Sequence, residues 1–159
     1  MATTNKLPGQ LKSFALMYWA MALMQVFFGV AVYVLITTGL LGEPDYTLAI
    51  LFQKIALILV PGLMASGYFL FRYLVSKLDP KLPLEEKVKR YFSYTLIRGS
   101  LIEVGFIFCC VAAVITHVQL FLWIAPVVFL VFLLLRPTPE GMTGDLQLSP
   151  IDSNKLRKP

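Results

Sequence analysis

Histidine and cysteine are nearly absent from this chain: it has one histidine, His117, and two cysteines, the adjacent Cys109 and Cys110. A single histidine cannot supply the two axial ligands that a b-type haem normally takes, and it leaves no ligand set for a metal cluster. The chain also offers no Ser-His-Asp set and no glycine-rich phosphate loop. We therefore expect no enzymatic activity, no cofactor and no metal site, and we interpret the two thiols as small buried side chains.

Charged residues are scarce as well, at 14% of the chain, whereas soluble domains carry about 25%. The sequence is dominated instead by four long apolar runs, at about residues 13–40, 46–73, 91–117 and 120–135. Each run is near or above the roughly 20 residues that a helix needs to cross a bilayer. The sequence thus predicts an all-α fold, a polytopic bundle of four transmembrane helices within residues 1–136. We expect residues 137–159 to form a flexible tail.

Lysine and arginine are missing from the connections on one side of the predicted bundle, residues 41–45 and 117–119. They gather on the other side, before the first run, between the second and third, and after the fourth: Lys6, Lys12, Arg72, Lys77, Lys81, Lys87, Lys89, Arg90, Arg136, Lys155, Arg157 and Lys158. By the positive-inside rule, both termini are predicted to be cytoplasmic in a bacterial inner membrane. The net charge of +5 then indicates orientation and lipid contact, not nucleic-acid binding.

Three charged residues lie deep inside the predicted spans: Lys54, Arg98 and Glu103. Each costs roughly 2.5–3.5 kcal/mol to insert, and Gln25 and Gln53 are milder cases. Glu103 is expected close to the middle of the membrane. Arg98 precedes it by five residues and is rotated from it by about 140° around a helix, so the two are not expected to pair within the helix. We expect Arg98 to extend toward the inner headgroups.

Two hypotheses for Glu103 stay open. In the first, Glu103 pairs with Lys54, Gln53, Arg98 or a partner subunit and specifies helix packing. In the second, it is a protonatable site that carries a proton or binds a cation. We favour the first, which predicts a non-enzymatic membrane subunit, self-associating or accessory to a larger membrane complex. The alternative is a small oligomeric proton- or cation-coupled transporter or channel that uses Glu103.

Small residues and a proline mark the expected helix contacts. Pro61 removes a backbone donor inside the second run, so a kink is predicted there. Gly62 and Ser66, four residues apart, would let a neighbouring helix approach closely, and Gly99 and Gly105 are expected to do the same in the third run.

Helix starts are also predicted outside the spans. Asp79 before Pro80 is a candidate N-cap for an amphipathic beginning of the third helix. Ser149, followed by Pro150 and by Asp152 three residues later, predicts one short helix in the tail.

Three segments resemble a known group. They are Leu-Ile-Arg-Gly-Ser-Leu-Ile-Glu at residues 96–103, Leu-Arg-Pro-Thr at residues 135–138, and Asp-Leu-Gln-Leu-Ser at residues 145–149. They resemble small, uncharacterised four-span bacterial integral membrane proteins that share an Arg-x-x-x-x-Glu stretch and a Leu-Arg-Pro-Thr ending. The resemblance implies that Arg98, Glu103 and Arg136–Thr138 belong to one recurring design. It implies no activity.

Overall fold

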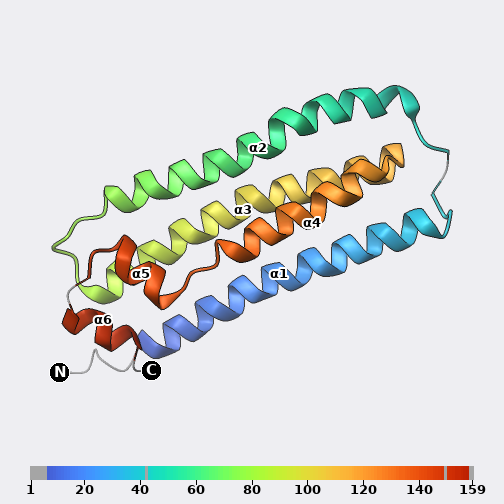
Figure 1. Ribbon diagram of the computed structural model, residues 1–159. Helices are drawn as coiled ribbons and strands as arrows, with labels where there is room; N and C mark the ends of the chain where they lie inside the picture. Colours follow the sequence, from blue (N-terminus) through green and yellow to red (C-terminus); the bar gives the residue numbers. More distant parts are fainter. Residues whose placement is uncertain (1–6, 42, 149, 158–159) are drawn as a thin grey trace.

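The computed structural model describes residues 7–41, 43–148 and 150–157, which form helices without any strand (Figure 1). The helices are α1 (Leu7–Thr37), α2 (Tyr46–Ser76), α3 (Leu84–Thr116), α4 (Gln119–Leu134), α5 (Pro139–Asp145) and α6 (Pro150–Arg157). The prediction of an all-α fold is confirmed over this part of the chain. Lys6, Lys158 and Ser149, which entered the predictions above, lie outside the described residues.

Three helices, α1, α2 and α3, are long and apolar enough to cross a membrane. The fourth candidate, α4, has 16 residues, which at the helical rise per residue make it about 24 Å long. It passes the same test only together with α5, from which it is bent by 71°. The described residues therefore contain three candidate spans, or four if the bent pair counts as one, and this is typical of a membrane protein.

The central helix is α3, which packs against α2, α4 and α1. Figure 1 shows α1 and α2 on opposite sides of the α3–α4 pair. The turn from α3 into α4 is very short because His117 takes a left-handed conformation, with φ of 53°, and ends α3. Two helices joined by so short a turn must lie antiparallel and adjacent.

One side of α3 is left uncovered by this arrangement. Its exposed apolar side chains, between 36% and 50% exposed, are Ile97, Val104, Ile107, Val111 and Ile115. Together with Ser100 and the partly exposed Glu103, these residues form what we call the open face of α3.

The start of α1, the end of α2, the start of α3 and both short helices lie at one end of the bundle, called here the terminal end (Figure 1). The α3 helix begins about two turns before the apolar run, after Pro83, so Asp79 is not its N-cap. The Asp79 carboxylate instead accepts a hydrogen bond from the backbone N–H of Lys81, 2.8 Å away. This keeps Asp79 in the turn that joins α2 to α3.

At the terminal end, α4 stops beside Arg98, while α3 continues past it toward Leu84. The tail helices add apolar side chains to this end. Met142 of α5 and Leu156 of α6 are buried there in a cluster with Phe71, Val88 and Tyr91. The sequence predicted one short helix in the tail, whereas the structure has two. The unpredicted helix, α5, begins with Thr138 as N-cap and Pro139 in its first turn.

Candidate functional site

Arg98 is buried, with 7% of its surface exposed, at the point where α4 ends. Its guanidinium donates a hydrogen bond to the backbone carbonyl of Leu135, 2.5 Å away, and lies 4.0 Å from the ring centroid of Phe71. The last carbonyls of a helix lack donors within the helix and carry partial negative charge, so a cation is a favourable cap. The side chain therefore ends on protein at the level where α4 ends, and its extension toward the inner headgroups stays a prediction.

A second side chain serves the same helix end. The Tyr18 hydroxyl of α1 donates a hydrogen bond to the backbone carbonyl of Phe132, and the two rings stack with centroids 4.5 Å apart. Tyr18 and Arg98 thus satisfy two of the carbonyls that the end of α4 leaves without helical donors. We call Tyr18, Phe71, Arg98, Phe132 and Leu135 the cap cluster. It ties α4 to three other helices.

Glu103 has a very different environment from Arg98. It is partly exposed at the edge of the open face and makes no hydrogen bond or ion pair in the described part of the chain. Along α3 it lies between Gly99, which meets Phe132, and Phe106, whose ring meets Phe129. Both contacts are with the last turns of α4, but Gly105, two residues further along α3, meets Val60 and Leu63 near the middle of α2. Glu103 therefore lies near the middle of the long helices. A carboxylate at this depth in a bilayer is costly without a partner.

Lys54 and Gln53 of α2 do not approach Glu103. Lys54 is exposed, Gln53 is partly exposed, and neither has an ion pair or hydrogen bond among the described residues. The antiparallel contact of α2 with α3 places Val60 and Leu63 beside Gly105. By residue counting from this contact, Lys54 lies on the order of 12 Å along the bundle from Glu103. Of the partners considered for Glu103 within the chain, the structure brings none to it.

Two of the predicted glycines lie in tight helix contacts. A Cβ atom at Gly99 would lie 3.2 Å from the Phe132 ring, and one at Gly105 would lie 3.8 Å from Val60. Sequence reasoning did not single out Gly67 of α2, where a Cβ would lie 3.4 Å from the Arg98 carbonyl oxygen. The sequence did contain an indication of this contact. Gly67 is a third small residue after Gly62 and Ser66, and it lies on a different face of the helix, about 100° around from Ser66.

Pro61, Gly62 and Ser66 are exposed and lie away from the bundle. The α2 helix continues through Pro61. A Cβ at Gly62 would meet nothing within 4 Å. Within one chain, the pair Gly62 and Ser66 therefore brings no helix close to α2.

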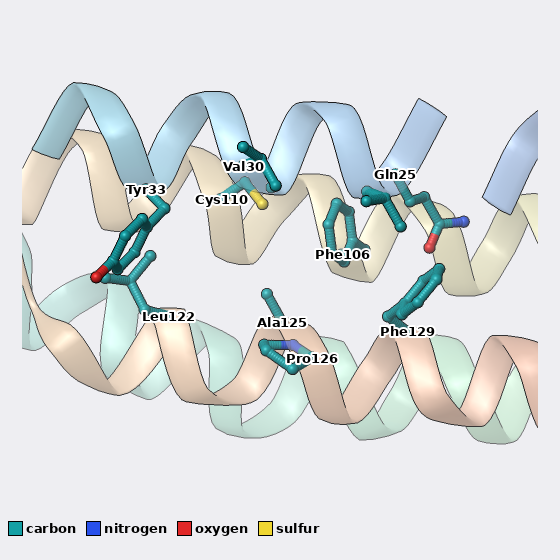
Figure 2. Close-up of a pocket in the computed structure, with 11 residues that line it drawn as sticks. Gln25, Val30, Tyr33, Phe106, Cys110, Leu122, Ala125, Pro126 and Phe129 are labelled. Carbon is teal, nitrogen blue, oxygen red and sulfur yellow. The ribbon is translucent and has the colours of Figure 1, made fainter. Parts of the chain in front are cut away.

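Sequence reasoning also gave little weight to Gln25 of α1, which is 2% exposed. Neither its Nε2 nor its Oε1 atom has a hydrogen-bond partner among the described residues. The side chain lines a pocket between α1, α3 and α4 (Figure 2). A buried, unpaired amide is rare enough in folded proteins to need an explanation.

A polar contact at the terminal end was not predicted either. The Asp145 carboxylate of α5 accepts a hydrogen bond from the Tyr91 hydroxyl, 2.9 Å away, and pairs with Arg72 at 3.3 Å. The contacts join residues more than 50 positions apart in sequence. No local pattern along the chain indicates them.

Comparison of the chain with protein-family models, with curated proteins and with solved structures gave no match. The described residues also contain no group of three histidine, cysteine or acidic side chains that would hold a metal ion. The candidate site is therefore defined by polar side chains on apolar helices. Among the described residues, Arg98 has partners, whereas Glu103 and Gln25 have none.

Proposed function

We propose that the protein is a non-enzymatic membrane subunit that associates, with a second copy or with another membrane protein, through the open face of α3. The observation that carries this proposal is the unpartnered carboxylate of Glu103. A charge at mid-membrane depth costs about 2.5–3.5 kcal/mol on insertion scales, and such residues nearly always face protein or a water-filled cavity. A partner helix that offers a hydrogen-bond donor to Glu103 would remove much of that cost.

The shape of the bundle supports the same proposal. Because α1 and α2 lie on opposite sides of the α3–α4 pair, the open face runs between them as a surface that no described helix covers. Ser100 lies on this face near Glu103 and leaves room for a close helix. The exposed Gly62 and Ser66 offer α2 a second position of this kind.

The same proposal includes a topology with α4 as a fourth span and both termini in the cytoplasm of a bacterium. Its support is the distribution of basic residues: of the described ones outside α3, only Lys54 lies far from the terminal end. A cysteine introduced at Lys81 should resist a membrane-impermeant thiol reagent added to intact inner membranes from the periplasmic side. Labelling at that position would overturn the orientation.

The association is tested by the native mass of the gently solubilised protein, with identification of everything bound. Glu103→Gln keeps the size of the side chain and removes the charge, and we expect it to weaken the assembly at least tenfold. Glu86→Gln is the matched control, because Glu86 pairs with Arg90 on the surface of the first turns of α3. A wild-type protein that runs as a monomer without companions would contradict the proposal.

The alternative function is a small oligomeric transporter or channel for protons or cations. It is favoured by the same unpaired carboxylate, because a carboxylate neutralised within the chain would not be available to an ion. In that case Glu103→Gln should abolish flux in proteoliposomes while the assembly stays intact. Retained flux together with a retained assembly would contradict both functions.

A further inference from the structure

The pocket that contains Gln25 is elongated and almost wholly apolar. Gln25 lies at one end and Tyr33 at the other, with Phe106, Leu122, Pro126 and Phe129 among the residues between α1, α3 and α4 (Figure 2). Its volume is about 270 Å³. Eight residues of helix separate Gln25 from Tyr33, a distance of about 12 Å along the helix axis. A space of this volume stretched over that length suits an elongated molecule.

The pocket opens to the outside of the bundle along α1. Val26, Val30 and Tyr33, which form that rim, are between 44% and 58% exposed. Because the surrounding helix faces are apolar, the entrance lies where a bilayer would be. A molecule that enters here comes from the membrane.

Water does not account for the unpaired amide of Gln25. A buried water needs two to four polar partners, and it stays out of cavities that lack them. Of the described side chains that line the pocket, those with polar groups other than Gln25 are Tyr33, at the far end, and the Cys110 thiol, a weak partner. A single water beside Gln25 would have the amide as its main partner.

The chemistry of the amide selects the polar group of the ligand. Gln25 has both a donor, Nε2, and an acceptor, Oε1, without partners. A hydroxyl group both donates and accepts, whereas a ketone or an ester only accepts and would leave Oε1 unpaired. No lysine, arginine or histidine is among the described residues that line the pocket, so an ionised carboxylic acid would lack a counter-charge.

From these observations we infer that the pocket between α1 and α4 is a binding site for an uncharged long-chain alcohol, alkyl or isoprenoid, whose hydroxyl pairs with Gln25. The chain of the ligand lies against Phe106, Phe129 and Pro126 and leaves through the rim at Val30. This site is separate from the open face of α3, and its occupancy does not depend on association of the protein.

The inference is tested by photolabelling the purified full-length protein in nanodiscs with a decanol that carries a diazirine in its chain. Labelled residues are mapped by mass spectrometry, and we expect them on α1 and α4 around the pocket. Excess 1-decanol should compete with the label, whereas decyl methyl ether, which cannot donate, should compete at least fivefold less well. Equal competition by the two compounds would overturn the assignment of a hydroxyl.

Two variants separate recognition from folding. Gln25→Leu should lower the labelling at least fivefold and, without ligand, raise the melting temperature, because a leucine at this buried position needs no hydrogen bond. Val30→Trp at the exposed rim should block labelling, whereas Val34→Trp, exposed on the same helix outside the pocket, should not. Wild-type labelling of Gln25→Leu, or a lowered melting temperature of that variant, would overturn the inference.

Discussion

Arg98 and Glu103 are five residues apart on one helix, and both are charged side chains in an apolar run, yet the structure treats them oppositely. Arg98 turns into the bundle, where a backbone carbonyl and an aromatic ring receive it. Glu103 stays at the edge of the open face without a partner among the described residues. The comparison shows that the contacts of a charged side chain in an apolar helix, and not its position in the run, decide whether its cost is compensated. Arg98 is explained by partners within the chain, whereas for Glu103 we propose a partner outside it.

The largest loss of stability should come from removing the charge of Arg98, which has partners inside the bundle. Arg98→Leu deletes a charge-assisted hydrogen bond and a partly desolvated cation–π contact, and it leaves the Leu135 carbonyl without that donor. We expect the free energy of unfolding to fall by about 3 kcal/mol. Reversible unfolding in mixed micelles measures this value.

The control for this prediction is Arg90→Leu, which removes a charge from the same helix. Arg90 is on the surface and pairs with Glu86 one turn away, so we expect a far smaller loss of stability than in Arg98→Leu. Similar losses in the two variants would show that Arg98 does not stabilise the end of α4 in the way described.

The difference between Arg98 and Glu103 also shows which features of the structure could be predicted from the sequence and which could not. Long apolar runs predict helices because backbone groups in lipid must be satisfied within the segment, and α1 to α4 follow those runs closely. The rotation of Arg98 away from Glu103 was likewise predictable from helical geometry. The partner of Arg98 was not, because Leu135 is 37 residues away and meets Arg98 only through the level at which α4 ends.

The tail shows the same limit. Thr138 and Pro139 form a recognisable helix start, but the one helix predicted in the tail was the helix after residue 149. The burial of Met142 depends on α3 continuing past the end of α4. The distance by which α3 extends beyond the end of α4 is a property of the assembled bundle. It cannot be predicted from the sequence of either helix alone.

The next effect in size concerns two glycines five residues apart on α2. Gly67→Leu introduces a side chain against the Arg98 carbonyl and Leu101, and overpacking of this kind should cost about 2 kcal/mol. Gly62→Leu meets open space, so the stability of the monomer should not fall. Both are measured by unfolding in micelles. An equal loss for both variants would place Gly62 in a contact that one chain does not show.

Removing the unpartnered charge should act in the opposite direction to removing Arg98. Glu103→Leu in dilute, monomeric protein should raise the free energy of unfolding by about 1–2 kcal/mol, a part of the insertion cost of the carboxylate. The same variant should weaken the association in its native membrane. Opposite signs in the two measurements would sharpen the comparison with Arg98. A destabilised monomer would show that Glu103 has a partner inside the chain and would end the comparison.

The smallest effect concerns the contact that holds α5. Tyr91→Phe removes a hydrogen bond from a buried hydroxyl to the Asp145 carboxylate, and it should lower the free energy of local opening of α5 by about 1 kcal/mol. Arg72→Gln removes the other partner of Asp145, but the Arg72 side chain is 60% exposed, so we expect this variant to lower the same free energy by less than about 0.5 kcal/mol.

Hydrogen exchange at the amides of Met142 and Leu146 reports the local opening of α5, since both amides donate hydrogen bonds within the α5 segment. Exchange should accelerate roughly fivefold in Tyr91→Phe and about twofold at most in Arg72→Gln. A larger effect of Arg72→Gln would mean that the ion pair, and not the buried hydroxyl, fixes the tail to the terminal end.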